Sequence, residues 1–396
     1  MVNEIMPGVF WVGYVDWDIR RFHGHELSTH RGTTYNAYLI RDEKIALVDT
    51  VWGPYADRLM ENIREVVDPA RIDFVVANHA EPDHSGSLSE VMRHAPNATV
   101  VVSPRGAESI PGHHHQDWRF RAVKTGERIS LGRSELIFVE APMLHWPDSM
   151  FTYLTGRNLL MPNDAFGQHY ATDFRFNDQV DPHALYHEAL KYYANILTPF
   201  SPLVLKKIQE VLALGLPVDM IAPSHGVIWR QEPLQIVHHY QEWAEQKPER
   251  RAVVLYDTMW GATRRLADAI GDGLAAEGVP HQAFLLSATD RNEVLAEVFR
   301  AGAVLVGSPT LNQGLLGSVI VLLEDLKHLK FRIPVGAAFG SYGWGGESVK
   351  LIEEKLTACG MRLAAPGLRV QWQPRPENLV AAESLGRAVA AAIKAG

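Results

Sequence analysis

Cysteine is almost absent from this sequence of 396 residues. Cys359 is the only thiol, so an intrachain disulfide is impossible and thiol usage gives no support to secretion. An iron centre held by cysteines is excluded as well, because such centres need about four thiolates. We therefore expect a cytoplasmic protein, and any electrons that it uses must come from another molecule.

Long apolar runs and an excess of basic residues are also missing. No run of about 18 apolar residues occurs, and the first residues lack a basic start followed by an apolar stretch, so we expect neither membrane spanning nor export. Lys and Arg total 38 against 46 Asp and Glu, and the resulting net charge of −8 disfavours a nucleic-acid surface. Hydrophobic residues make up 46% of the chain, as in ordinary globular proteins.

The chain divides into two halves with different patterns. The polar segment 245–250, which contains a proline, directly precedes the apolar stretch 252–256. We place a domain boundary there, which gives domains 1–248 and 249–396. The second domain alternates strands and helices, and this pattern predicts a doubly wound parallel sheet. Its expected strands are 252–257, 281–286, 303–308, 333–339 and 368–372, and its expected helices are 263–277, 291–300, 318–329, 346–358 and 377–394.

The first domain contains many strands and fewer helices. Mixed strands with flanking helices predict a two-sheet sandwich covered by helices on both sides. The expected strands are 8–15, 35–41, 44–49, 73–78, 98–103, 135–140, 150–155, 158–161 and 218–222, and the expected helices are 55–66, 87–94, 183–197 and 202–214.

Four apolar strands of the first domain end on residues that can bind metals. The candidate ligands are His79, Glu81, Asp83, His84, His145, Asp164 and His225. Strand ends at one rim of a sheet can converge on a single cavity. His79, Glu81 and Asp83 are spaced by two, so we expect an extended backbone to turn them the same way. The set exceeds one tetrahedral zinc site and suffices for two metals bridged by a carboxylate.

The kinds of ligand indicate which metal binds. Carboxylates and imidazoles without a thiolate suit iron better than a structural zinc, although composition alone leaves zinc open. The run His113-His114-His115 also looks like a metal site. Because three consecutive side chains diverge, we interpret it as a surface turn.

Three loops of the second domain predict a flavin site. The segment 257–263, at the first strand-to-helix junction, offers hydroxyls and a helix N-terminus that suit a single phosphate. The segments 307–314 and 340–346 follow the third and fourth strands, where ligands of doubly wound sheets bind. Their glycines and aromatic residues suit a flat ring, and FMN fits all three loops. The candidate FMN-binding residues are Thr258, Met259, Trp260, Gly261, Ala262, Thr263, Ser308, Pro309, Thr310, Leu311, Asn312, Gly314, Ser341, Tyr342, Gly343, Trp344 and Gly345.

The two motif sets together resemble the flavodiiron proteins. The motif His-x-Glu-x-Asp-His at 79–84, with the three later ligands, resembles their metallo-β-lactamase-like domain, and the second domain resembles flavodoxin. Hydrolases of that superfamily usually have His in place of Glu81. The resemblance implies an oxidoreductase that reduces dioxygen to water, nitric oxide to nitrous oxide, or both, at a diiron site that receives electrons through FMN.

The resemblance also implies a role for individual residues. It implies one iron bound by His79, Glu81 and His145, the other bound by Asp83 and His225, and Asp164 as the bridge, with His84 a less constant ligand. The loop 21–27 resembles a family loop near the metals, so His23 or His25 is expected to donate a proton or a hydrogen bond to bound oxygen.

The family resemblance extends to assembly and partners. It implies a homodimer or a dimer of dimers, and a separate electron donor that is rubredoxin or a reduced deazaflavin. Two alternatives stay open: a zinc hydrolase with a regulatory flavodoxin domain, and a flavin electron carrier or sensor whose first domain is only a scaffold. Glu81 argues against the first alternative, and the intact ligand set argues against the second.

Overall fold

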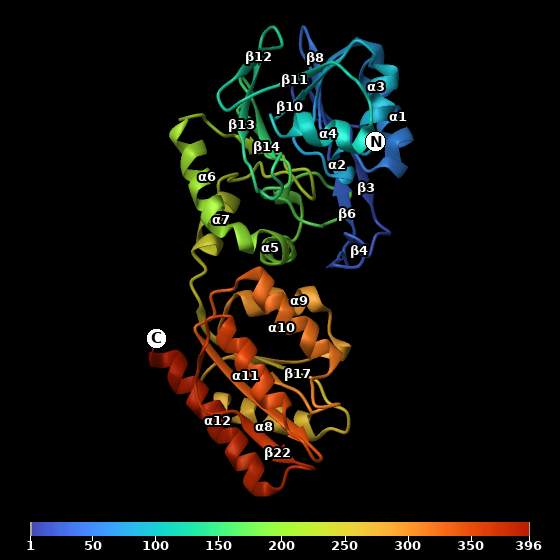
Figure 1. Cartoon of the computed structure of the whole chain (residues 1–396). Helices are drawn as coiled ribbons and strands as arrows, with labels where there is room; N and C mark the ends of the chain where they lie inside the picture. Colours follow the sequence, from blue (N-terminus) through green and yellow to red (C-terminus); the bar gives the residue numbers. More distant parts are fainter. Residues whose placement is uncertain (1, 396) are drawn as a thin grey trace. The chain divides into compact units, whose positions relative to one another are not determined.

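The computed structural model describes residues 2–395 and contains two compact units (Figure 1). The first comprises the residues up to Tyr193 together with Phe200–Ala244, and the second comprises Ala194–Pro199 and the residues from Glu245 onward. The predicted limits differ from this division in that residues 194–199 and 245–248 fall in the second unit. No helix within residues 2–395 is long and apolar enough to cross a membrane.

Two sheets form the centre of the first unit. The larger sheet has the order β1-β2-β7-β8-β9-β10-β11, and the smaller one has the order β12-β13-β14-β15-β16. The strands of the larger sheet are β1 (Asn3–Met6), β2 (Val9–Trp11), β7 (Tyr38–Arg41), β8 (Ile45–Val48), β9 (Ile72–Val76), β10 (Thr99–Val102) and β11 (Phe120–Ala122). Those of the smaller sheet are β12 (Arg128–Ser130), β13 (Glu135–Glu140), β14 (Met150–Leu154), β15 (Leu159–Met161) and β16 (Met220–Ile221).

A shared apolar core holds the two sheets together. Trp11 and Val76 of the larger sheet and Phe138 and Met161 of the smaller one belong to a single cluster of buried side chains. Helices flank the sheets, and on the side of the smaller sheet Lys207 donates to the Glu140 carbonyl over 2.6 Å. The helices of this unit are α1 (Ala56–Val66), α2 (Pro82–Ser85), α3 (Leu88–His94), α4 (Gly106–His114), α5 (Pro182–Tyr192), α6 (Ser201–Ala213) and α7 (Gln235–Glu245). The predicted sandwich covered by helices is confirmed.

Two predicted strands of the first unit are each broken in the middle. Strand 8–15 divides into β2 and β3 (Tyr14–Asp16), and strand 35–41 divides into β6 (Thr33–Tyr35) and β7. A Cβ on Gly13 would lie 2.1 Å from the Tyr35 carbonyl oxygen, so the two chains cross too closely for a larger residue. Asn36 turns away from the sheet, and its backbone N–H donates to the Ser224 carbonyl over 2.8 Å. The breaks therefore tie these strands to the segment that carries His225.

Several elements of the first unit were not predicted. They are β1, β11, β12, the short pair β4 (Arg21–Phe22) and β5 (Leu27–Ser28), and the helices α2, α4 and α7. His113 and His115 are exposed, so residues 113–115 lie at the surface as expected, but His113 and His114 belong to the last turn of α4 and do not form a separate turn. His114 is half-buried, and its Nε2 lies 3.3 Å from Ser85 Oγ. The short helical turns of the chain are η1 (Gly53–Tyr55), η2 (Pro69–Arg71), η3 (Asn177–Gln179), η4 (Tyr193–Leu197), η5 (Thr198–Phe200) and η6 (Leu286–Ala288).

The second unit contains a doubly wound parallel sheet with the order β18-β17-β19-β20-β21, and β22 also pairs with β20. Its strands are β17 (Glu249–Tyr256), β18 (His281–Leu285), β19 (Ala301–Gly307), β20 (Val335–Tyr342), β21 (Arg362–Leu363) and β22 (Leu368–Gln371). Its helices are α8 (Ala262–Ala276), α9 (Arg291–Phe299), α10 (Gly317–Leu329), α11 (Ser348–Ala358) and α12 (Pro376–Ala395). Every residue of β19 is buried, as expected for a parallel strand covered on both faces. The predicted flavodoxin-like fold is confirmed, with β21 as an unpredicted addition.

Helices α8 and α12 pack closely against each other in this unit (Figure 1). A Cβ on Gly273 of α8 would lie 2.1 Å from the Glu383 carbonyl oxygen of α12. A Cβ on Gly386 of α12 would lie 2.2 Å from the Ile270 carbonyl oxygen of α8. The two glycines therefore let the helix backbones approach, and both helices cover the same core.

We predict that Gly273→Ala lowers the free energy of unfolding of the second unit by about 1–3 kcal/mol, because the new methyl group overpacks the helix contact. The matched control is Gly317→Ala, since a Cβ at Gly317 would meet nothing within 4 Å. Hydrogen exchange of the β17 and β19 amides in urea measures the change. Equal stability of the two variants would contradict the close-packing account.

Candidate functional site

The loop after β9 carries four of the predicted ligands. His79 and Glu81 precede α2, which begins at Pro82, so that Asp83 and His84 lie on a single helical turn. The prediction that His79, Glu81 and Asp83 all turn the same way is therefore wrong for Asp83. Proline fixes a backbone angle that suits the first position of a helix, which explains the change at Pro82.

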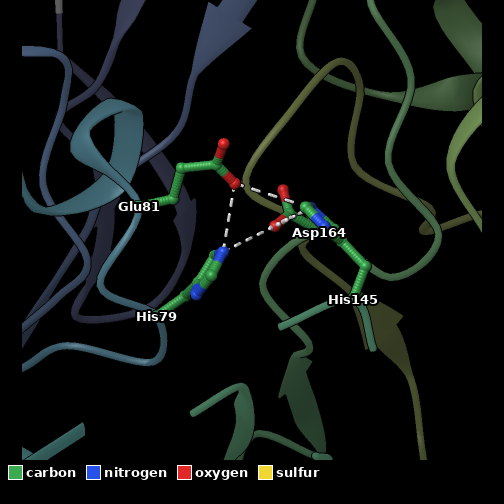
Figure 2. Close-up of side chains that lie close together, drawn as sticks. All are labelled: His79, Glu81, His145 and Asp164. Carbon is green, nitrogen blue, oxygen red and sulfur yellow. Dashed lines mark hydrogen bonds and ion pairs between the residues drawn. The ribbon is translucent and has the colours of Figure 1, made fainter. Parts of the chain in front are cut away.

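Four side chains form the first ligand group, and Figure 2 shows them pointing toward one another. His79 Nε2 lies 3.2 Å from Glu81 Oε2 and 3.8 Å from Asp164 Oδ2. His145 Nε2 lies 3.6 Å from Glu81 Oε2 and 3.3 Å from Asp164 Oδ2. None of these side chains is more than 10% exposed. The imidazole nitrogens and carboxylate oxygens thus converge on one point away from water.

Asp83, His84 and His225 form a second group beside the first. His225 Nε2 lies 3.0 Å from Asp83 Oδ2, and His84 Nε2 lies 3.1 Å from the same oxygen. Asp164 Oδ1 approaches both rings, at 3.0 Å from His84 Nε2 and 3.4 Å from His225 Nε2. Asp164 therefore faces the first group with one carboxylate oxygen and the second group with the other.

The charges of the two groups perturb each other strongly. Burial lowers the pKa of His79, but its hydrogen bonds with Asp148 and Glu81 outweigh this effect and raise the pKa to about 9. Burial raises the pKa of Asp164, but the nearby positive charges of His84 and His145 hold the pKa well below its usual value. Such a cluster has the electrostatics of a cation site, in which protonated imidazoles take the place of the cation.

Some buried polar atoms of the two groups have no hydrogen-bond partner within residues 2–395. Among the atoms that face the two groups, these are Asp83 Oδ1, Asp164 Oδ2 and His84 Nε2. Buried polar groups in proteins are nearly always paired, so exceptions call for an explanation. Metal ions at the two groups would supply the missing partners, and the donor set of carboxylates and neutral imidazoles fits such ions.

Sequence reasoning missed Asp49, which ties the ligand-bearing segments together. Its carboxylate accepts from the Asn78 backbone N–H over 2.8 Å and from the Asn163 amide and the Ser224 hydroxyl over 3.3 Å each. Asn78, Asn163 and Ser224 directly precede His79, Asp164 and His225. Asp49 follows the apolar strand β8, so the strand-end pattern that identified the ligands could also have identified this residue.

Two further residues that contact the ligands were missed. Asp148 is buried, accepts from the Ala80 N–H over 2.7 Å, and lies 3.3 Å from His79 Nδ1. The Tyr192 hydroxyl, at the end of α5, donates to Asp164 Oδ1 over 3.1 Å. No periodicity or motif marks either residue, because each contact joins segments far apart in the chain.

The two candidate proton donors, His23 and His25, have different surroundings in the structure. His23 Nε2 lies 2.8 Å from Glu81 Oε1, and its side chain is 34% exposed. Burial lowers the pKa of His23, but the hydrogen bond and charge of Glu81 outweigh it and raise the pKa. His25 lies on the exposed turn between β4 and β5 and belongs to neither ligand group. His23 is therefore the better candidate of the two.

A cavity of about 390 Å³ opens at this side of the ligand groups. Phe22, Tyr35 and Trp52 contribute apolar and aromatic wall, and His23 and Glu81 contribute polar groups. This cavity gives small molecules a route from solvent to the buried ligands.

The predicted phosphate loop of the second unit lies between β17 and α8. Gly261 precedes α8 with φ of 80°, and a Cβ there would meet nothing within 4 Å. Thr258 Oγ1 accepts from the Gly261 N–H over 3.0 Å, and Thr263 Oγ1 lies 3.0 Å from Ser341 Oγ. The loop thus holds hydroxyls at a helix N-terminus, as expected for a phosphate site.

The other two predicted flavin loops follow β19 and β20 and lie beside each other. The Thr310 N–H donates to the Ser341 carbonyl over 2.9 Å, which links the loops. Leu311 and Gly314 close a tight turn through Asn312, which has a positive φ of 49°. The remaining predicted positions, Met259, Ala262, Ser308, Pro309, Tyr342, Gly343 and Gly345, lie in the same three segments.

Large aromatic side chains at these loops are exposed to solvent. Trp260 is 87% exposed, Trp344 is 93% exposed, and Trp372, which was not predicted, is 66% exposed. Trp372 directly follows β22, and its N–H donates to the Tyr342 carbonyl over 2.7 Å. The sequence could have identified Trp372, because it is an aromatic residue directly after the last strand of the sheet. Exposed aromatic rings beside a phosphate loop fit a flat ligand such as FMN.

We predict that Asp49→Asn destabilises the first unit, because the new amide donor would face the Asn78 and Asn163 amides. Each buried donor left without an acceptor costs about 1–3 kcal/mol. Asp219→Asn is the matched control, since Asp219 is exposed and its carboxylate accepts from the Asn158 amide over 2.8 Å. Urea unfolding followed by hydrogen exchange of the β9 and β15 amides measures both, and equal losses would contradict the role of Asp49.

Two family models match the chain. The family described as ODP family beta lactamase matches residues 33–226, and the flavodoxin family matches residues 254–386. The nitric oxide reductase of Moorella thermoacetica is 51% identical over 391 residues, which cover 98% of both chains. The anaerobic nitric oxide reductase flavorubredoxin of Vibrio vulnificus is 47% identical, over 94% of this chain and 76% of the relative.

Solved structures agree with these relatives over the full length. The rubredoxin oxygen:oxidoreductase of Desulfovibrio gigas superposes with a TM-score of 0.97 at 38% identity and covers 100% of this chain and 99% of that chain. The flavodiiron protein of Giardia intestinalis superposes with a TM-score of 0.95 at 32% identity and covers 100% of this chain and 97% of that chain. The chain therefore belongs to the flavodiiron protein family.

Proposed function

We propose that this protein is a flavodiiron oxidoreductase that reduces dioxygen to water, nitric oxide to nitrous oxide, or both. The observation that carries the proposal is the placement of Asp164, whose two carboxylate oxygens each face one of two adjacent buried ligand groups. Such an arrangement suits two metal ions that share a carboxylate and act together on a small substrate.

We assign the ligands of the two irons from these groups. His79, Glu81 and His145 would hold one iron, Asp83 and His225 the other, and Asp164 would bridge them. His84 joins the second position, because its Nε2 lies near the same Asp83 and Asp164 oxygens as His225. Bound irons would act as one-electron donors, and a reduced FMN would supply two further electrons.

His23 and Tyr192 are placed to handle protons and orient the bridge. His23 holds a proton beside Glu81, at the exposed side of the first group. The Tyr192 hydroxyl donates a hydrogen bond to Asp164 Oδ1 and so fixes the orientation of that carboxylate. Proton supply matters because water is a product with either gas.

The FMN site would use the three loops of the second unit. Thr258, Gly261 and Thr263 would surround the phosphate at the start of α8, and Tyr342 and Trp344 would cover the ring. Trp372 joins this set because it is exposed and its backbone contacts Tyr342.

A zinc hydrolase is the less favoured reading of the same fold. Glu81 adds a second carboxylate to the first ligand group, and hard oxygen ligands suit a redox-active iron. The relatives found along the whole chain are named as reductases and an oxygen oxidoreductase.

The remaining assignments concern assembly and context. We place the domain boundary between residues 248 and 249, the protein in the cytoplasm, and its assembly as a homodimer or a dimer of dimers. A separate rubredoxin is the favoured electron donor, and a reduced deazaflavin is the alternative. The name of the Desulfovibrio gigas structure, which pairs rubredoxin with oxygen, supports the first of these donors.

We predict that Asp164→Ala loses most of its iron and all gas reduction while it keeps its FMN. The reason is that the substitution removes the carboxylate shared by both metal groups, whereas the flavin loops lie in the other unit. Iron, zinc and flavin are measured on protein purified without oxygen, with the exposed Asp57→Ala as control. Stoichiometric zinc with hydrolase activity in the unaltered protein would refute the proposed function.

We predict that electrons reach the irons only through FMN from a separate donor. Thr258→Val and Thr263→Val should weaken FMN retention and slow turnover while iron content stays constant, because only the hydroxyls of the phosphate loop are lost. Thr357→Val, on the exposed side of α11, is the control. Stopped-flow flavin reduction and gas-electrode rates test the order. Fast NADH oxidation by the pure protein, or full gas reduction without FMN, would contradict it.

A further inference from the structure

We infer that Asp148 is a positioning residue that makes the two metal positions unequal, so that the His79 position holds its metal more tightly. This inference rests on the proposed diiron function. It follows from the surroundings of the second ring nitrogen, Nδ1, of His79, His84 and His225, which is the nitrogen that points away from the metal groups.

Asp148 gives His79 a charged partner. The carboxylate lies 3.3 Å from His79 Nδ1, on the side of the ring opposite the ligand group. Its other oxygen accepts from the Ala80 N–H over 2.7 Å, so the carboxylate is held by the backbone of the loop that carries His79. The Asp148 side chain is 2% exposed. Water therefore screens this contact little, and the His79 ring has one preferred orientation.

The loop of Asp148 is itself anchored. The Ser103 hydroxyl donates to the Asp148 carbonyl over 2.7 Å. Trp146, two residues earlier, packs edge-on against the His79 ring with 4.9 Å between ring centroids. Asp148 thus connects the loop that carries His145 to the loop that carries His79, which are the two histidines of the first group.

The histidines of the second group have different partners. His225 Nδ1 lies 2.6 Å from the Thr34 carbonyl oxygen, which is a neutral acceptor. His84 Nδ1 is buried and has no hydrogen-bond partner within residues 2–395. A carboxylate partner fixes the tautomer of a ligand histidine and increases its basicity more than a neutral carbonyl does. Only the first group has such a partner among these three rings.

The consequence is an order of metal retention. Outer partners of this kind change metal affinity by about 10–100-fold when they are removed. We therefore expect ferrous iron to leave the unaltered protein in two phases, with the slower phase from the His79 position.

The test is Asp148→Asn, which keeps the shape of the side chain and removes its charge. Ferrous iron is withdrawn anaerobically from the full-length protein with an excess of chelator, and release is followed by absorbance. We expect the slow phase to become about 10–100-fold faster and the fast phase to stay within about threefold. Mössbauer spectra of the loaded variant should show a change in one of the two iron signals, which a purely structural role would not produce.

Glu140→Gln is the matched control. Glu140 ends the strand that leads into the His145 loop, and its carboxylate accepts from the Thr125 N–H instead of contacting a ligand ring. Loss of this charge should leave both phases unchanged. Ser103→Ala is a milder variant that loosens Asp148 without removing it, and it should accelerate the slow phase by a smaller factor.

Two unchanged phases in Asp148→Asn and Ser103→Ala, or equal acceleration of both phases, would overturn the inference. If Asp148→Asn yields no folded protein, the Ser103→Ala result decides. The proposed function is judged separately, by two irons and gas reduction in the unaltered protein. Those results would stand even if Asp148 proved unimportant, so the two failures are distinguishable.

Discussion

The structure of the first unit depends on the burial of several carboxylates and imidazoles at one rim of its sandwich. Glu81, Asp83 and Asp164 lie within two adjacent groups, and all three are at most 8% exposed. Unpaired charges are very unfavourable in such a place, so the cluster requires positive charge from protons or metal ions. The pKa of His79 is raised and the pKa of Asp164 is lowered because protonated imidazoles stabilise the buried carboxylates.

The surrounding fold holds this cluster in place. Each ligand segment follows a strand of the apolar core, and Asp49 joins the residues directly before His79, Asp164 and His225. The break at Asn36 also holds a ligand in place, because the Asn36 side chain donates to the Pro223 and Gly226 carbonyls on either side of His225. Rigid supports of this kind keep ligand atoms converging before any metal is present.

Much of this arrangement could be predicted from the sequence, and the rest depends on contacts between distant segments. Mixed strands with flanking helices predicted the sandwich, and the alternation of strands and helices predicted the second unit. The strand-end pattern and the composition of residues 79–84 predicted the candidate ligands. The helical turn after Glu81 has a local signal in Pro82 itself. The broken strands at Gly13 and Asn36 depend on contacts with Tyr35 and Ser224, which the apolar pattern does not show. Asp148 was missed because its partners, His79 and Ala80, lie 69 and 68 residues away.

The most direct test of the central claim is the anomalous diffraction of crystals grown without oxygen, recorded on both sides of the iron absorption edge. The account predicts two iron peaks, one among His79, Glu81 and His145 and one among Asp83, His84 and His225, with Asp164 in contact with both. A single peak, or peaks that appear only at the zinc edge, would contradict it.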